Sequence, residues 1–395
     1  MITLASEELC SACGACMSVC SHKCITMKCN GIGQFFPSID NDKCVACHAC
    51  ENVCPILNVP HTNLPRKAYA AWSLDEEQRR TSASGGIAYE LYNYAIAHGY
   101  KVVGASFNDD LSVSLKIAST KEEISPFKNS KYVFSECYEL YPKIKEELRK
   151  GVKMLIVGVS CQIAAMRNLF SKYDDIVFVE ILCHGMVPYS YLQQHISSIE
   201  KKRQEKAFSM SFRAPEAHTY TYTLSLYNKE GKSFYAATKN DGDTYQIGFS
   251  RAITYMESCY HCHFAQRERV GDIILCDFYG LGKEKEFFHD TKEVSCILTI
   301  TDKGEEFIDE VFKTNVLFVE ERPLNEAING NPRLQIPNAK TKERIIFEKN
   351  ITKTLGNYEE AIAPLAAKYM KTVNRSKTYY HWQGLKYRFK RLFGK

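Results

Sequence analysis

The chain has 395 residues, which is too many for one compact core and enough for two or three domains. Apolar residues make up 45% of the sequence and charged residues 25%, which is typical of a soluble globular protein. No apolar run approaches the roughly 18 residues of a membrane span, and the start, MITLASEELC, lacks the basic and apolar segments of a secretory signal. We therefore expect a cytoplasmic protein.

The cysteines concentrate near the N-terminus. Ten of the 17 lie before residue 55, in a sequence without an export signal, so metal ligation is favoured over disulfide formation. Two runs, CSACGACMSVC at 10–20 and CVACHACENVCP at 44–55, repeat the offsets three, three and four between sulfurs. They are the one clear internal repeat of the sequence.

The spacing within these runs indicates iron-sulfur clusters. Three cysteines at intervals of three can bind three corners of one cubane, whereas the fourth cysteine of a bacterial ferredoxin run binds the other cluster. Structural zinc usually takes two separated CxxC pairs, so this spacing argues against zinc. We predict two 4Fe-4S clusters, one bound by Cys10, Cys13, Cys16 and Cys54 and the other by Cys20, Cys44, Cys47 and Cys50.

Three residues near the two cysteine runs depart from the ferredoxin pattern, but none of them removes a predicted ligand. Cys54 is followed by Pro55, whereas Cys20 is followed by Ser21, so the loop after the first run is less pre-organised. Cys24 and Cys29 fall between the runs outside the pattern, and we expect them to be small buried or surface thiols.

Beyond the linker NVPHTNLPRK (58–67), the pattern changes to mixed α/β. Residues 85–99 have helical periodicity closed by a glycine, and the strand-like segment YKVVGASF follows. Two apolar strands, 152–159 and 175–183, flank the helix 162–173, which predicts a parallel βαβ unit. The segments SMSFRA, TYTYTLSLYN and KSFYAATKN are predicted antiparallel strands, and GDIILCDFYGLG contains another apolar strand.

Four further cysteines occupy suggestive positions. Cys161 and Cys183 each follow an apolar strand, at the sheet edge where open parallel sheets bind ligands. Cys259 and Cys262 form a CxxC pair. Position alone is equally compatible with ordinary buried thiols at Cys161 and Cys183.

Several motifs in order resemble one known family. They are SASGGIA (82–88), NSKYVFS (129–135), GVSCQIAAMRNL (158–169), CHGMVP (183–188), SFR (211–213) and CYHCHFAQRERVGDIILCDFYG (259–280). The chain resembles the beta subunit of coenzyme factor-420 hydrogenases and dehydrogenases over about residues 66–300. Members of that family are iron-sulfur flavoproteins that bind FAD beside a cluster.

The resemblance implies a third 4Fe-4S cluster held by Cys161, Cys183, Cys259 and Cys262. The alternatives are that only the CxxC pair binds metal, or that none of the four does. One departure from the family is Ser160, where relatives often have proline before the first of these cysteines.

The resemblance also implies FAD contacts. It points first to Ser82, Ser84, Gly85 and Gly86, where a glycine pair opening a helix lets backbone N–H groups approach a diphosphate; without the resemblance, this segment is a simple helix start. Further candidates for the flavin are Ser130, Lys131, Tyr132, Arg213 and Asp277, and His184 is a candidate for proton delivery or for support of the neighbouring cysteine.

These inferences combine into one expected organisation. The fold class is α+β, with a ferredoxin-like dicluster domain at 1–58 followed by a mixed α/β flavin-binding domain. That domain comprises a flavin-binding part at 66–150 and a third-cluster part at 151–345, and a basic tail spans 350–395.

The expected function is that of an oxidoreductase in which electrons from a reduced partner reach FAD, which reduces a two-electron organic acceptor. The acceptor is the deazaflavin coenzyme or another compound, for example one in polysaccharide synthesis, and no catalytic residue is assigned. The alternative is an electron-transfer subunit without a substrate site that docks to a hydrogenase or dehydrogenase. Expected partners are a ferredoxin or such a subunit, and a small organic acceptor.

The net charge of +5 is concentrated in the tail. Residues 361–395 contain nine Lys or Arg and no Asp or Glu, so subtracting these nine leaves −4 for the remainder. This distribution argues against a nucleic-acid partner. Leu385, Phe389 and Leu392 lie at helical spacing among the cations, which is compatible with peripheral contact at the inner membrane face, with a partner-docking helix or with a solvated tail.

Overall fold

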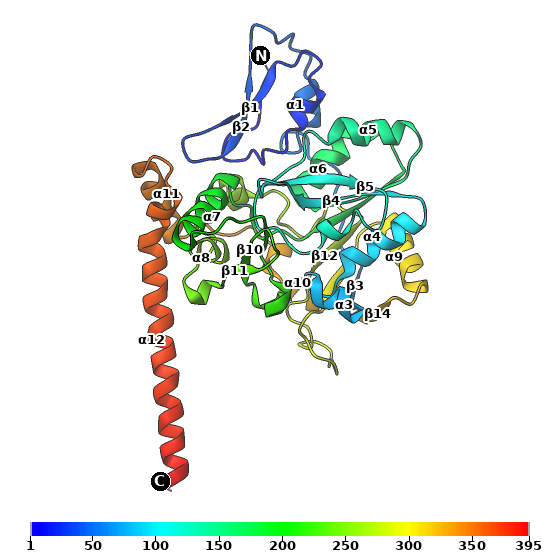
Figure 1. Ribbon diagram of the computed structural model, residues 1–395. Coiled ribbons are helices and arrows are strands. Elements are labelled where there is room, and N and C mark those ends of the chain that lie inside the picture. The colour runs from blue at the N-terminus through cyan, green and yellow to red at the C-terminus, as the bar shows by residue number, and fades with distance from the viewer. Residues whose placement is uncertain (1, 394–395) are drawn as a thin grey trace.

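The computed structural model describes residues 2–393, and for residues 377–393 it describes the backbone alone. Figure 1 shows a small N-terminal module resting on a body built around a large sheet, with one long C-terminal helix that extends away from the body. The mixed α/β architecture after an N-terminal cysteine-rich module confirms the predicted fold class.

The N-terminal module is small and contains two short helices and one hairpin. Helices α1 (Ala15–Val19) and α2 (Ala49–Val53) each lie inside one cysteine run. Strands β1 (Ile25–Cys29) and β2 (Phe35–Ile39) pair in antiparallel fashion between them. The two runs therefore have the same local structure, as their shared spacing predicts.

A nine-stranded mixed sheet forms the centre of the body. In spatial order its strands are β14 (Leu317–Arg322), β3 (Lys67–Ser73), β13 (Ser295–Thr299), β12 (Ile273–Asp277), β8 (Ile176–Ile181), β7 (Met154–Val159), β4 (Lys101–Phe107), β5 (Val113–Ala118) and β6 (Ser135–Glu136). The central strands β4, β7, β8 and β12 run parallel to one another. The predicted βαβ unit is confirmed, because α6 (Ser160–Leu169) connects β7 to β8.

Helices cover both faces of this sheet, which explains why its central strands are apolar throughout. Helices α4 (Ile87–Ala97) and α9 (Asp302–Lys313) pack on one face. Helices α5 (Tyr141–Arg149) and α6 pack on the other face, beneath the N-terminal module (Figure 1). Helix α10 (Leu324–Gly330) covers the end near β3 and β13, and α3 (Glu76–Thr81) follows β3.

A second layer of the body contains a small antiparallel sheet and four helices. The strands are β9 (Ser209–Ser211), β10 (Leu224–Tyr227) and β11 (Ser233–Ala237), and the helices are α7 (Tyr189–Arg203), α8 (Thr244–Ser250), α11 (Lys342–Lys353) and α12 (Tyr358–Phe393). Their apolar side chains share one core.

One predicted strand is wrong in its first half. The segment TYTYTLSLYN was expected to be extended throughout, but Thr219–Thr221 forms a 3₁₀ turn. Tyr222 has a positive φ of 56°, which ends the turn and reverses the chain before β10 begins at Leu224. The alternating Thr and Tyr residues therefore do not form a strand here. A hydrogen bond stabilises the turn instead, because the Thr221 hydroxyl donates to the carbonyl of Ala217 at 3.0 Å.

The region predicted as a basic tail begins inside the body. Ala361, Ile362 and Leu365 on α12 are buried in the core shared with α7 and α8. The side chains of Leu385, Phe389 and Leu392 lie outside the described residues. In the part of the chain that the structure describes, no helix has the length and apolar character needed to cross a membrane.

A buried histidine connects the base of α12 to the second layer. His195 Nε2 lies 3.0 Å from Asp243 Oδ2, and His195 Nδ1 lies 2.7 Å from Glu359 Oε1. Burial by itself would lower the pKa of His195, but the two carboxylates outweigh it and raise the pKa to about 9. The imidazolium is therefore the form that joins α7, α8 and α12.

We predict a stability loss in mildly alkaline solution. Because the pKa of His195 in the folded state lies above its usual value near 6.5, its contribution is complete below pH 6.5 and is lost as pH rises through about 9. The loss should reach about 3 kcal/mol, measured as the free energy of unfolding from pH 6 to 9.5. His195→Gln should flatten this slope and exposed His98→Gln should retain it; equal slopes in all three proteins would contradict the assignment.

Candidate iron-sulfur and flavin sites

Four of the predicted ligand cysteines meet at the carboxyl edge of the parallel strands. Cys161 lies in the first turn of α6 directly after β7, and Cys183 follows β8, whose register pairs Val159 with Ile181. Cys259 and Cys262 come from the turn η5 (Glu257–His261) and the residue after it. All four line one cavity, which has about 670 Å³ of space free of atoms. The structure thus brings the set together, and its role as a ligand set stays a prediction.

The chemistry of this cavity suits an iron-sulfur cluster. Thiolate sulfur is a soft ligand that prefers zinc or iron-sulfur clusters, but a single zinc ion would draw four sulfurs to within about 4 Å of one another, since Zn–S bonds are about 2.3 Å. Among the side chains of residues 2–376, no three from His, Cys, Asp or Glu are grouped to hold one metal ion. Burial raises the pKa of Cys183 to about 12, so cluster binding here would have to displace a proton.

The loop after Cys183 is held by close backbone packing. Gly185 has a φ of 142°, and a Cβ at this position would collide with the ring of Tyr255. The amide of Met186 donates to Cys259 Sγ at 3.3 Å, and the amide of Met256 donates to the carbonyl of Met186 at 2.7 Å. The CHGMVP motif therefore fixes two of the four cysteines relative to each other.

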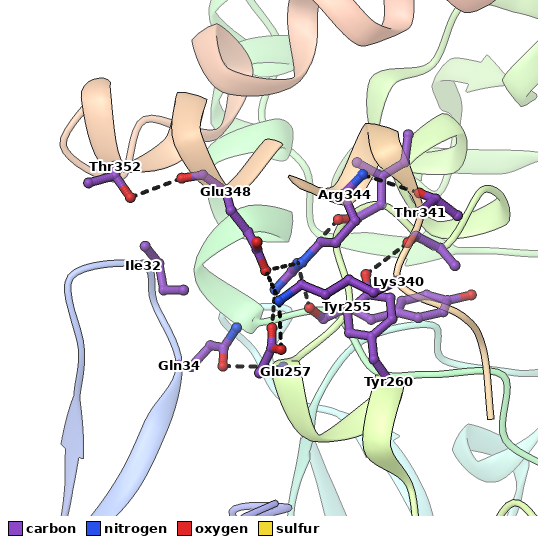
Figure 2. A network of polar contacts seen from close by, with 12 residues as sticks. Ile32, Gln34, Tyr255, Glu257, Tyr260, Lys340, Thr341, Arg344, Glu348 and Thr352 are labelled. Atoms are coloured by element: carbon purple, nitrogen blue, oxygen red, sulfur yellow. Dashed lines mark hydrogen bonds and ion pairs between the residues drawn. The ribbon is translucent and has the colours of Figure 1, made fainter. Parts of the chain in front are cut away.

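A buried arginine fixes the segment that leads to the CxxC pair (Figure 2). Arg344 on α11 is 1% exposed and donates to the carbonyls of Ile253 and Tyr255 at 3.1 and 2.8 Å. It also forms ion pairs with Glu257 at 3.2 Å and Glu348 at 2.9 Å. The start of η5 is thereby tied to α11.

The same network reaches the N-terminal module. The amide of Glu257 donates to Gln34 Oε1 at 3.3 Å, and Figure 2 shows Gln34 and Ile32 on the hairpin that faces the network. Tyr191 Oη donates to the carbonyl of Ile32 at 2.7 Å. The tip of the β1–β2 hairpin is therefore docked on η5 and α7.

The first N-terminal cysteine set surrounds a cavity of its own. Cys10, Cys13, Cys16 and Cys54 all line it, in the grouping that the sequence predicts. Each run carries positive φ angles at equivalent places, 54° at Ala12 and 71° at Gly14 in the first, 53° at Ala46 and 59° at His48 in the second. This repeated backbone curls each run around its first three cysteines.

The second set is more exposed than the first, and it packs against Cys16 of the first set. Cys20, Cys44 and Cys50 pack in one cluster, and Cys47 is exposed to solvent. Buried Cys24 lies among them, with its sulfur 3.3 Å from Cys20 Sγ. Cys29 is exposed. Sequence spacing gave no sign that Cys24 contacts this set.

The first set adjoins the cavity at the sheet edge. The carbonyl of Cys13 accepts hydrogen bonds from Tyr141 Oη at 2.8 Å and from Cys137 Sγ at 3.4 Å, both from the body. Leu9 and Ser11, beside Cys10, line the sheet-edge cavity together with Cys161. The first and third sets are therefore neighbours.

Several of the residues predicted to contact FAD form one polar network at the end of β12. Arg213 Nη2 lies 2.7 Å from Asp277 Oδ2, and Arg213 Nε donates to Tyr132 Oη at 2.6 Å. Ser84 Oγ donates to the carbonyl of Val294 at 2.9 Å. Burial would raise the pKa of Asp277, but the charge of Arg213 and its hydrogen bond hold it below its usual value. Tyr222 Oη also donates to Asp277 at 3.0 Å, a contact that the sequence did not indicate.

The remaining flavin candidates differ in whether their polar groups already have hydrogen-bond partners within the protein. Gly86 is the N-cap of α4, as a glycine helix start predicts, but the N–H of Gly85 already donates to Ser295 Oγ at 2.8 Å. Lys131 Nζ donates to the carbonyls of its own loop, including that of Lys128 at 2.7 Å. The hydroxyl of Ser82 is buried and has no hydrogen-bond partner in the described structure.

The last candidates lie beside this network. The backbone amide of Ser130, two residues before Tyr132, donates to Asn129 Oδ1 at 3.1 Å. His184 lines the sheet-edge cavity and is close enough to Asp277 and Arg213 for their charges to act on it, although burial dominates and lowers its pKa. The hydroxyl of Ser82, which has no partner in the described structure, is a group that a flavin diphosphate could satisfy, whereas Arg213 is already paired with Asp277.

We predict that Gly185→Ala removes iron from the third set alone. The added Cβ would displace Tyr255 and shift the CHGMVP loop, so iron should fall from about 12 to about 8 per chain. Gly231→Ala is the matched control, because Gly231 also has a positive φ, 74°, but faces open space. Unchanged iron in Gly185→Ala, measured after anaerobic purification, would show that the loop does not hold the set.

Both parts of the chain are similar to known proteins. Residues 151–324 match the family model for the C terminus of the coenzyme F420 hydrogenase/dehydrogenase beta subunit, and residues 9–57 match the 4Fe-4S dicluster domain. One subunit of the F(420)H(2) dehydrogenase of Methanosarcina mazei is 22% identical over 271 residues, which cover 65% of this chain and 72% of that protein. A chain of the F420-reducing [NiFe] hydrogenase complex from Methanosarcina barkeri aligns with a TM-score of 0.45 and 19% identity, over 74% of this chain and 95% of that one. Residues 151–324 thus belong to the coenzyme F420 hydrogenase/dehydrogenase beta-subunit family, and an N-terminal 4Fe-4S dicluster domain precedes them.

Proposed function

We propose that this chain is an iron-sulfur flavoprotein oxidoreductase with three 4Fe-4S clusters and one FAD, which reduces a two-electron organic acceptor or runs in reverse. When bound, the clusters handle single electrons and the flavin handles one or two, so together they interconvert the two kinds of transfer. The observation that carries the proposal is the spatial order of the three cysteine sets and the polar network.

The three cysteine sets and the polar network form a series that begins at the protein surface and ends in the body. The second set is exposed at Cys47, with Val45 57% exposed beside it, which suits contact with a redox partner. The first set adjoins the third through Cys13 and Ser11. His184 lines the cavity of the third set and lies within reach of the charge of Asp277. Such an order supports stepwise transfer from a partner protein to the flavin network.

The polar network would bind and orient the flavin. Arg213 is buried and positively charged, so it suits a diphosphate or the reduced ring, while Tyr132 and Tyr222 offer aromatic faces and hydroxyls beside it. The acceptor is a deazaflavin coenzyme or another two-electron compound; the F420 in the name of the Methanosarcina mazei relative supports the deazaflavin.

A second candidate function is an electron-transfer subunit without a substrate site that docks to a hydrogenase or dehydrogenase. One observation favours it, because Arg213, Asp277 and Lys131 bond to protein groups in this structure. The relative from Methanosarcina mazei is itself named as a subunit of a dehydrogenase. Flavin content separates the two functions.

The deciding measurement is non-haem iron and extracted flavin per chain after strictly anaerobic purification. Three four-iron clusters with FAD should give about 12 irons and one flavin. Cys183→Ala should lower iron to about 8, whereas Cys276→Ala, a cysteine on β12 outside the predicted sets, should leave it unchanged. A wild-type protein with about 8 irons and no flavin would instead be a ferredoxin-like relay.

Flavin retention should depend on the arginine of the network. Arg213→Met removes the buried cation but keeps much of its volume, so we expect FAD to be lost while iron stays at about 12. Arg322→Met is the matched control, because Arg322 is also buried and paired, with Glu326 at 2.8 Å, but lies outside the network. Full flavin in Arg213→Met, measured as FAD extracted from the denatured protein, would remove this network from the flavin site.

A further inference from the structure

A fully buried ion pair lies beside the sheet-edge cavity. Arg269 is 1% exposed and Glu180 is 0% exposed, and the Arg269 guanidinium donates to Glu180 Oε1. Ser160 Oγ donates to the same carboxylate at 2.6 Å and accepts from Arg269 Nη2 at 3.1 Å. Arg269 and Ser160 both line the cavity. The serine that replaces the proline expected from the family thus has a partner.

The contacts of Arg269 reach every chain segment that supplies a cysteine to the cavity. Ser160 immediately precedes Cys161, and Glu180 lies on β8 three residues before Cys183. Arg269 Nη1 donates to the carbonyls of Phe264 and Gln266 at 2.6 and 2.8 Å, in the loop that follows the CxxC pair.

The backbone of Arg269 makes one more connection. Its amide donates to the carbonyl of Asn63 at 2.8 Å, and its carbonyl accepts from the amide of Asn63 at 3.0 Å. Asn63 lies in the linker that follows the N-terminal module. Arg269 is therefore bonded to both strand ends, to the loop after the CxxC pair and to the linker.

The buried ion pair is better suited to positioning the cysteine-bearing segments than to raising the free energy of unfolding. A deeply buried ion pair adds little net stability, because the cost of removing both charges from water offsets their attraction. The guanidinium offers a planar fork with five donors, which a lysine ammonium cannot reproduce. The Arg269 charge also lies at the wall of the cavity that the four cysteines line.

We propose that Arg269, with Glu180 and Ser160, is a positioning residue that holds Cys161, Cys183 and the Cys259–Cys262 segment in register for one cluster and sets the charge beside it. This inference rests on the proposed third cluster. It assigns to Arg269 a role that neither cysteine spacing nor the flavin network implies.

The test compares iron content and EPR signals of the reduced full-length protein, purified anaerobically. Arg269→Met should lose the third cluster, with iron falling from about 12 to about 8 per chain and the two N-terminal cluster signals retained. Arg322→Met also breaks a buried ion pair and should keep about 12 irons. Wild-type iron in Arg269→Met, or an equal loss in Arg322→Met, would overturn the proposal.

A conservative variant keeps the test decisive if Arg269→Met does not fold. Arg269→Lys keeps the charge but loses the fork, so the midpoint potential of one cluster out of three should shift in an EPR-monitored redox titration. Three unchanged potentials would overturn the positioning role. A wild-type protein with about 8 irons would contradict the proposed third cluster itself, whereas a wild type with about 12 and unaffected variants would contradict the role of Arg269 alone.

Discussion

The parallel alignment of β7, β8 and β12 places the proposed sites at one edge of the sheet. Because these strands run in the same direction, their carboxyl ends lie together at that edge, where Cys161 follows β7, Cys183 follows β8 and Asp277 ends β12. The helices on both faces keep the three strands buried, so the edge is the part of the sheet that a ligand can reach. The cysteine cavity and the polar network are both consequences of this alignment.

Buried arginines turn that edge into a defined site. Arg269 bonds the strand ends to the loop after the CxxC pair, Arg344 bonds the segment before it to α11, and Arg213 pairs with Asp277. Each guanidinium has acceptors from separate chain segments, so each fixes a relative position that apolar packing leaves adjustable. Together they explain how irregular loops, which carry most of the cysteines, keep a fixed geometry.

The cysteine sets of the N-terminal module and the parallel core were predictable because they depend on local spacing. Offsets of three and four between sulfurs specify a tight loop, and a continuous apolar strand followed by a helix specifies a βαβ unit. The contact of Cys24 with the second set was not predictable, and neither was the 3₁₀ turn at Thr219–Thr221. Both depend on neighbours distant in sequence or on one positive φ angle, and a periodic pattern contains no information about either.

Cysteine spacing and strand patterning were enough to predict the dicluster module and the order of the α/β elements, and a family resemblance pointed to the four later cysteines. The folded chain was needed to show that these four share one cavity, that the first set adjoins it and that Glu180 meets Arg269. The physical reason is that ligand spacing and strand patterning are local properties of the chain. The convergence of segments about 100 residues apart depends instead on sheet register and on buried ion pairs, such as the one that joins residues separated by 89 positions.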